Sequence, residues 1–196
     1  MTSHRILVTG GAGFVGSAMA LGLKARYNNS QVTVLDNLKR RGSELNLPRF
    51  KQAGIEYVHG DIRSPEDLDA NLLKPDLIVE CSAEPSVLAG YSSPGYVLQT
   101  NLVGTINCLE LARQAKADFL FFSTSRVYPV AAITQLSYQE TATRLTLLED
   151  QHLPGVSAAG IAEDFPLEGA RSLYGATKLA SELLITEYAE AYGLRA

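Results

Sequence analysis

A tyrosine and a lysine four residues apart, Tyr174 and Lys178, are the residues of this chain best suited to acid–base chemistry. On a helix these positions share one face, so both side chains can point into one cleft. An ammonium group beside a phenol stabilises the phenolate, which lets the tyrosine act as a base at neutral pH. Thr124 offers a hydroxyl that can hydrogen-bond an alcohol substrate. The alternatives are a solvent-facing helix start and, at residues 123–125, polar strand-end residues or a local cap.

Three glycines near the start of the chain, Gly10, Gly13 and Gly16, follow an apolar strand at residues 4–9 and open a helical pattern. Gly10 permits a tight turn, Gly13 lets the main chain approach a phosphate, and Gly16 lets the helix lie close to the sheet. The amides of the helix N-terminus then face an anion. The spacing is Gly-x-x-Gly-x-x-Gly, and it predicts a pyrophosphate site.

A second apolar strand, residues 31–35, ends at Asp36. An acidic residue there accepts hydrogen bonds from the adenosine ribose hydroxyls and repels a 2′-phosphate, so it favours NAD over NADP. Arg40 and Arg41 keep NADP open, since a guanidinium beside the ribose accommodates that phosphate. A simple glycine turn followed by a capping aspartate is the other alternative. Strand, helix, second strand and terminal aspartate coincide, which favours the dinucleotide site.

Composition narrows the function classes. The chain has 196 residues, 46% hydrophobic and 19% charged, with a net charge of −4, which fits one globular domain and gives no basic surface for nucleic acid. It shows neither an apolar run of the ~18 residues that span a membrane nor room for a signal peptide, so we expect a cytoplasmic protein with no membrane partner. Cys81 and Cys108 are predicted to be reduced thiols, and the histidine spacing predicts no metal.

Strands and helices alternate along the chain, which predicts an α/β fold with a doubly wound parallel sheet, the Rossmann fold. We expect strands at residues 4–9, 31–35, 55–59, 76–81 and 118–123, and helices at 14–27, 43–53, 65–72, 95–115 and 174–192. Residues 124–173 form a long loop after the fifth strand, where open α/β sheets bind ligands. We expect this loop to face the substrate, with a disordered insert as the alternative.

Six motifs occur in order along the chain: residues 9–16, Asp36–Leu38, Gly60–Arg63, Asn101–Thr105, Ser123–Tyr128 and Tyr174–Lys178. By these motifs the chain resembles the extended short-chain dehydrogenases/reductases of the NAD-dependent epimerase/dehydratase family. Within that family, residues 36–47 and 84–87 most resemble the group of CDP-paratose (CDP-tyvelose) 2-epimerases.

This resemblance implies an NAD-dependent nucleotide-sugar epimerase that oxidises a sugar hydroxyl and returns the hydride to the other face of the keto intermediate. It implies catalytic roles for Thr124, Tyr174 and Lys178. The implied cofactor site consists of Gly10, Gly13, Phe14, Val15, Gly16, Asp36, Asn37, Asp61, Ile62, Ala83, Asn101, Tyr174 and Lys178, with Asn101 acting through its helix.

Two departures from the family pattern stand out. Related 4,6-dehydratases place Asp-Glu after the catalytic threonine, where this chain has Ser125 and Arg126, so the resemblance disfavours a dehydratase. Relatives often carry His-x-Ala-Ala where this chain has residues 80–83, Glu-Cys-Ser-Ala.

The resemblance also implies further strands and a C-terminal domain that holds the nucleotide sugar. We therefore expect residues 1–196 to be the NAD-binding domain, truncated before the sixth strand and the C-terminal substrate domain, and the full-length form to be a homodimer that pairs through helices 95–115 and 174–192. Two alternatives remain: another nucleotide-sugar oxidoreductase such as a UDP-sugar 4-epimerase, and a non-catalytic NAD-binding regulatory protein.

Overall fold

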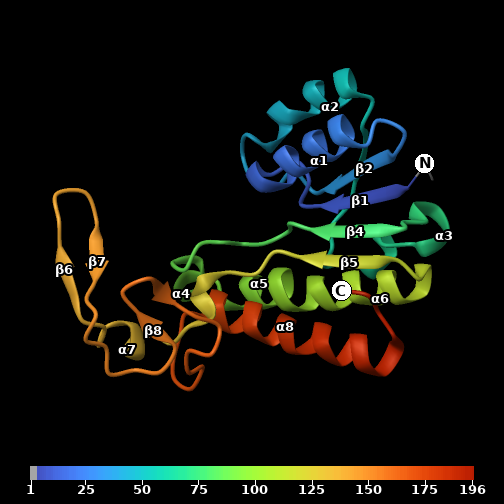
Figure 1. Ribbon diagram of the computed structural model, residues 1–196. Helices are drawn as coiled ribbons and strands as arrows, with labels where there is room; N and C mark the ends of the chain where they lie inside the picture. Colours follow the sequence, from blue (N-terminus) through green and yellow to red (C-terminus); the bar gives the residue numbers. More distant parts are fainter. Residues whose placement is uncertain (1–3) are drawn as a thin grey trace.

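A five-stranded parallel sheet organises the chain in this computed structural model, which describes residues 4–196 (Figure 1). The strands are β1 (Arg5–Thr9), β2 (Gln31–Asp36), β3 (Glu56–His59), β4 (Leu77–Glu80) and β5 (Asp118–Phe121). Their order is β3-β2-β1-β4-β5. After β3 the chain crosses to the other side of β1, which places a topological switch point between β1 and β4. The predicted doubly wound fold is confirmed, with every strand within two residues of its predicted bounds.

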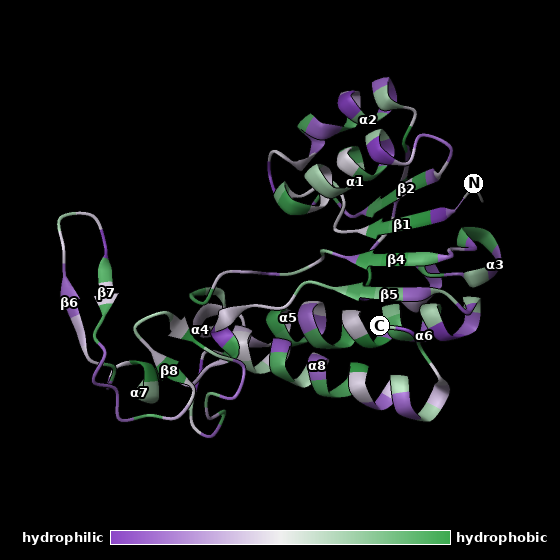
Figure 2. Ribbon diagram, viewed as in Figure 1, coloured by the Kyte–Doolittle hydropathy of each residue, from purple (hydrophilic) through white to green (hydrophobic). Residues whose placement is uncertain are grey.

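Both faces of the sheet are buried. Ile6 and Val8 pack with α1 (Phe14–Arg26) and α2 (Leu47–Ala53), whereas Leu7 packs on the face covered by α3 (Ala70–Leu73), α6 (Gly104–Ala115) and α8 (Leu173–Tyr192). Successive strand residues point to opposite faces, so a strand covered on both sides needs a continuous apolar run. Figure 2 shows this, with hydrophobic strands lying between helices of mixed hydropathy.

Two of the predicted helices are interrupted. The helix expected at 43–53 is a 3-10 turn, η1 (Ser43–Asn46), followed by α2. Asn46 Nδ2 donates a hydrogen bond to the Ala12 carbonyl, which ties this turn to the glycine loop. The helix expected at 65–72 is η2 (Pro65–Asp67) followed by α3, because the Asp69 side chain accepts a hydrogen bond from the Asn71 amide and starts a new helix.

The helix expected at 95–115 contains a wider turn. It consists of α5 (Pro94–Leu98), the π-helical segment η3 (Gln99–Val103) and α6, and it follows the short helix α4 (Ala89–Ser92). A π segment frees carbonyl groups from the helix ladder, and such segments often lie at functional sites.

Residues 124–173, which the sequence predicted as a long loop, contain short helices and hairpins. They contain η4 (Ser125–Val127), α7 (Val130–Ile133) and two hairpins, β6 (Tyr138–Glu140) with β7 (Leu145–Leu147) and β8 (Val156–Ser157) with β9 (Gly160–Ile161). Phe165 is buried and meets the Tyr128 ring edge-on at 5.3 Å. Figure 1 shows this segment, in orange, beyond the carboxyl ends of the strands.

Cys81 and Cys108 are free thiols, as expected. Burial raises the pKa of Cys81 to about 12, so this thiol stays protonated at neutral pH. Among residues 4–196, no helix is long and apolar enough to cross a membrane. The same residues bring together no group of three His, Cys, Asp or Glu side chains suited to a metal ion.

Candidate functional site

A cleft of about 400 Å³ opens at the carboxyl ends of the strands. The residues of the predicted site that line it are Gly10, Gly13, Phe14, Val15, Gly16, Asp36, Asn37, Asp61, Ile62, Ala83, Tyr174 and Lys178. Asn101 and Thr124 do not line it. The fold therefore brings the glycine loop and the Tyr/Lys pair to one cleft, although more than 150 residues of sequence separate them.

The glycine loop has no room for side chains at two positions. Gly10 has a φ of 61°, and a Cβ there would lie 2.6 Å from Ser82 Cα. A Cβ on Gly16 would lie 2.3 Å from the Gly10 carbonyl oxygen. Gly13 caps α1 with extended backbone and without a side-chain hydrogen bond. The first amides of α1 therefore stay available at the cleft, which is the arrangement that binds phosphate oxygens.

Asp36, the last residue of β2, is oriented by the backbone around it. Its Oδ2 accepts a hydrogen bond from the Ala12 amide at 3.0 Å, and its Oδ1 accepts one from the Leu38 amide at 2.8 Å. Each carboxylate oxygen has a second acceptor site. Asp36 can therefore accept hydrogen bonds from ribose hydroxyls while it remains fixed to the loop.

Asp36→Ala is expected to weaken NAD⁺ binding by about 10–100-fold, because hydrogen bonds to a charged group contribute about 1.5–3 kcal/mol. The affinity for NADP⁺ should fall less than the affinity for NAD⁺, so the ratio of the two affinities should become smaller. Calorimetric titration with both cofactors checks this. Asp36→Asn, which keeps an acceptor for the Leu38 amide but removes the charge, is the matched control: an unchanged preference in both variants would mean that another group reads the ribose.

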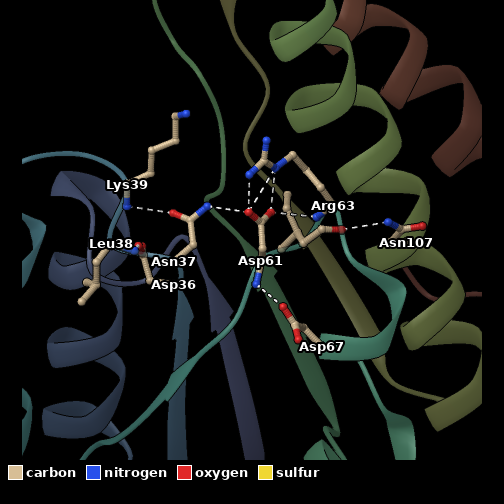
Figure 3. A network of polar contacts seen from close by, with 9 residues as sticks. Asp36, Asn37, Leu38, Lys39, Asp61, Arg63, Asp67 and Asn107 are labelled. Carbon is tan, nitrogen blue, oxygen red and sulfur yellow. Dashed lines mark hydrogen bonds and ion pairs between the residues drawn. The ribbon is translucent and has the colours of Figure 1, made fainter.

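A polar network continues the cleft beyond β2 (Figure 3). Asp61 accepts hydrogen bonds from Asn37 Nδ2 at 2.8 Å and from the Arg63 guanidinium, whose Nη2 lies 2.5 Å from Asp61 Oδ2. The Arg63 guanidinium holds the pKa of Asp61 well below its usual range. Asp61 therefore stays ionised and holds Asn37 at the cleft wall.

Tyr96 is a cleft residue that the sequence reasoning missed. Its ring contacts two cations, with Lys39 Nζ 4.3 Å and Arg63 Cζ 5.4 Å from the ring centroid. Lys39 and Arg40 also line the cleft, whereas Arg41 does not. In the sequence Tyr96 is only the second residue after Pro94, at the start of a predicted helix, and no local pattern marks it.

The helix α8 is held close to η4 at its first turn. Ser172 caps α8 by accepting a hydrogen bond from the Gly175 amide at 3.1 Å. A Cβ on Gly175 would lie 2.0 Å from the Arg126 carbonyl oxygen. Only glycine allows this approach, so Gly175 brings the segment after β5 against the first turn of α8.

Lys178 is 2% exposed, and its Nζ donates a hydrogen bond to the Phe122 carbonyl at 2.8 Å. The same Nζ lies 4.1 Å from the centroid of the Phe121 ring. Burial lowers the pKa of Lys178 from its ordinary value. Tyr174 is half-buried and lines the same cleft one turn earlier on α8.

Two neighbouring hydroxyls lie at the end of β5. Thr124 is half-buried and caps η4, with its Oγ1 accepting a hydrogen bond from the Arg126 amide at 3.3 Å. Ser123 lines the cleft, and its hydroxyl donates to Glu182 Oε1. Sequence reasoning named Ser123 only as a polar residue at the strand end.

Asn101 is fully buried in η3 and bridges two walls of the site. Its Oδ1 accepts a hydrogen bond from the Glu84 amide at 2.8 Å, and its Nδ2 donates to the Glu84 carbonyl at 3.1 Å. The same Nδ2 lies 3.4 Å from Thr177 Oγ1 on α8. Asn101 thus links the loop after β4 to the helix that carries Tyr174 and Lys178.

This geometry agrees with comparisons to known proteins. Residues 6–196 match the sequence profile described as "NAD dependent epimerase/dehydratase family". The chain belongs to this family. The resemblance read from its motifs is thereby confirmed, and so is the assignment of NAD as the cofactor of the family.

Individual relatives differ in their chemistry. The chain is 32% identical to CDP-paratose 2-epimerase of Salmonella typhi over 97% of its own length and 54% of that protein. It is 30% identical to dTDP-glucose 4,6-dehydratase of Mycobacterium tuberculosis, over 98% of the chain and 51% of the relative. The crystal structure of Thermus thermophilus UDP-glucose 4-epimerase in complex with NAD superimposes with a TM-score of 0.70 at 29% identity, covering 97% of this chain and 52% of that one. The chain thus spans about half the length of these relatives.

Proposed function

We propose that this chain is the NAD-binding part of a nucleotide-sugar epimerase, and that its substrate is a CDP-sugar epimerised at C2. The observation that carries the proposal is the single cleft shared by the glycine loop, Asp36 and the pair Tyr174 and Lys178. The glycine loop suits a pyrophosphate, because Gly13 begins α1 at the cleft without a side-chain cap and leaves the first helix amides free for an anion. The choice of a CDP-sugar rests on the similarity to the Salmonella typhi 2-epimerase.

Bound NAD⁺ supplies the hydride acceptor and donor for such a reaction. Tyr174, at the cleft wall, takes the proton of the sugar hydroxyl on its phenol oxygen and returns it when the alcohol re-forms. Lys178 Nζ, fixed on the Phe122 carbonyl, keeps further protons to donate toward a ribose hydroxyl. The hydroxyl at the end of β5, from Thr124 or Ser123, positions the sugar hydroxyl.

The residues after β5 disfavour water elimination. A dehydratase needs an acid and a base beside the sugar. Related 4,6-dehydratases place Asp-Glu after the catalytic threonine, whereas this chain has Ser125 and Arg126 there, which carry no carboxyl group. A UDP-sugar 4-epimerase stays the second candidate, because the solved UDP-glucose 4-epimerase shares the fold and was solved in complex with NAD. In the full-length protein we propose a homodimer that pairs through α5–α6 and α8.

The proposed function is tested by incubating the longest available form of the protein with NAD⁺ and a panel of CDP-, UDP-, GDP- and dTDP-sugars. Proton NMR of the sugar then identifies epimers at C2 and C4. We expect a C2 epimer from a CDP-sugar. A C4 epimer from a UDP-sugar would favour the second candidate, and NAD binding without conversion of any sugar would favour a regulatory protein.

A pair of variants decides which hydroxyl acts on the substrate. If Thr124 holds the sugar hydroxyl, Thr124→Val should lower kcat by about 10²-fold, in line with the loss of one positioned donor, and Ser123→Ala should lower it much less. Steady-state rates of epimer formation check this. The reverse order would assign the role to Ser123, the residue that lines the cleft.

A further inference from the structure

A carboxyl group without a role in the proposed reaction lies inside the fold. Glu80 is the last residue of β4 and is 0% exposed. It is in register with Thr9 on β1 and Phe121 on β5. Register partners point to the same face of a sheet, so the side chains of Glu80 and Phe121 lie in one row. The Phe121 ring contacts the Lys178 ammonium.

If Glu80 were an ionised carboxylate, the groups around it would include more hydrogen-bond acceptors than donors. Thr105 Oγ1 lies 2.8 Å from Glu80 Oε1 and also 2.8 Å from the Asn101 carbonyl oxygen. A hydroxyl has one proton, whereas a carboxylate and a carbonyl only accept. An ionised Glu80 would therefore compete with Asn101 for that proton. Glu80 Oε2 has no hydrogen-bond partner among the described residues, which makes a buried charge there costly.

We propose that Glu80 is a neutral carboxylic acid that donates its proton to Thr105 Oγ1 and acts as a positioning residue for the helix that carries Tyr174 and Lys178. With this proton on Glu80, Thr105 donates to the Asn101 carbonyl, and both short contacts are hydrogen bonds. The chain of donors then runs in one direction, from Glu80 to Thr105 to Asn101.

Asn101 passes this arrangement on to α8. The side-chain Nδ2 of Asn101 lies 3.4 Å from Thr177 Oγ1. The backbone carbonyl oxygen of Asn101 lies 3.4 Å from the hydroxyl of Ser181, and that hydroxyl donates to the Thr177 carbonyl at 2.9 Å. Thr177 lies between Tyr174 and Lys178 on the helix. When Glu80 loses its proton, Thr105 no longer donates to the Asn101 carbonyl without competition. Asn101 then holds the helix that carries Tyr174 and Lys178 less firmly.

Electrostatics agrees with the geometry. Burial raises the pKa of Glu80 from 4.5 to about 7, with the Lys178 charge and the Thr105 hydroxyl opposing the shift. The other titratable groups that face it are Cys108 on α6 and the adjacent Cys81, whose thiols burial keeps protonated. Because the folded protein binds this proton more tightly than the unfolded chain, the stability that it contributes is full below pH 4.5 and is lost as the pH rises to about 7.

The test is a pH titration of this chain by NMR, with ¹³C at the glutamate carboxyl carbons and ¹⁵N at the amides. We expect the Glu80 carboxyl to titrate near pH 7, well above surface glutamates at about 4.3, and the amides of Asn101 and Thr177 to shift with the same midpoint. Glu80→Gln identifies the resonance. Its amide donates permanently to Thr105, so the amide shifts of Asn101 and Thr177 should no longer follow pH.

Thr105→Val serves as the matched control, because it removes the relay and leaves the carboxyl group in place. In this variant the Asn101 and Thr177 amides should no longer follow the Glu80 titration. A Glu80 carboxyl that titrates with the surface glutamates would overturn the proposal, and so would amides on α8 that ignore it. The wild-type titration decides this even if Glu80→Gln fails to fold.

The positioning role rests on the proposed function, so NAD⁺ affinity is the second measurement. In the wild type it should fall several-fold between pH 6 and pH 8.5, whereas in Glu80→Gln it should change less than about two-fold. Both proteins contain Lys178, Cys81 and Cys108. If the titration of one of these groups lowered NAD⁺ affinity at high pH, the same loss of affinity would appear in Glu80→Gln and would count against Glu80. A wild type that binds no NAD⁺ at any pH would refute the proposed function, while the carboxyl titration, which needs no cofactor, would still decide the protonation of Glu80.

Discussion

Tyr174→Phe is expected to lower the rate of epimer formation by about 10²–10⁴-fold, the usual contribution of a positioned acid–base group. The variant keeps the aromatic ring in the cleft wall and removes only the hydroxyl that is proposed to accept and return the proton. NAD⁺ affinity should stay within about two-fold, because the glycine loop and Asp36 hold the other half of the cofactor site. The checks are initial rates with the epimerised sugar and calorimetric titration with NAD⁺.

Tyr192→Phe is the matched control for this experiment. Tyr192 lies on the same helix, is 60% exposed and packs against Tyr188 at the end away from the cleft. Its rate should equal that of the wild type. A Tyr174→Phe enzyme that retains full rate would remove Tyr174 from the reaction and leave Lys178 or a β5-end hydroxyl as the proton acceptor.

Gly16→Ala is expected to reduce NAD⁺ affinity by at least about 100-fold, or about 2.7 kcal/mol. Its Cβ would lie 2.3 Å from the Gly10 carbonyl oxygen and 2.6 Å from Gly11 Cα, both backbone atoms that cannot turn aside. The start of α1 must then move away from the sheet, which carries its free amides away from the pyrophosphate. The same strain should destabilise the fold by about 1–3 kcal/mol.

Gly22→Ala separates this effect from a general intolerance of alanine in α1. Gly22 lies in the same helix, and a Cβ there meets nothing within 4 Å. That variant should bind NAD⁺ normally and be more stable by about 0.5–1 kcal/mol, since alanine loses less conformational freedom in a helix. Urea unfolding measures stability and calorimetry measures binding. Equal affinity in Gly16→Ala and the wild type would mean that the glycine loop is not the pyrophosphate site.

The sequence predicted the sheet well because strands buried on both faces leave an unambiguous signal. Residues such as Leu7 and Val8 point to opposite faces, and both must be apolar. The breaks in two helices were missed because they depend on single side chains. Asp69 starts a new helix by accepting a hydrogen bond from the Asn71 amide, and Asn46 turns toward the Ala12 carbonyl in the glycine loop.

A cleft residue could be predicted from the sequence where the proposed site requires one residue type. It could not be predicted where a residue lines the cleft only because of its position in the fold. Gly16 and Asp36 have few substitutes in a dinucleotide site, so their types reveal them. Tyr96 enters the cleft only because α5 brings its ring close to Lys39 and Arg63. Likewise, the sequence alone gives no reason to separate Ser123 from Thr124, since one lines the cleft and the other caps η4 only after β5 is placed.

Glu80 shows a further limit of sequence reasoning. In the sequence it is one carboxyl residue at the end of an apolar strand. Its protonation follows from a single shared hydroxyl, that of Thr105 between Glu80 and Asn101, and contacts between residues 25 positions apart are visible only in the fold.

Calorimetric titration of this chain with NAD⁺ and NADP⁺ tests most directly the claim that the cleft is a dinucleotide site. The account predicts one NAD⁺ per chain and weaker binding of NADP⁺, because the Asp36 carboxylate at the cleft would accept hydrogen bonds from the ribose and repel a 2′-phosphate. If neither dinucleotide binds, or if NADP⁺ binds as tightly as NAD⁺, the assignment of this cleft and of Asp36 is contradicted.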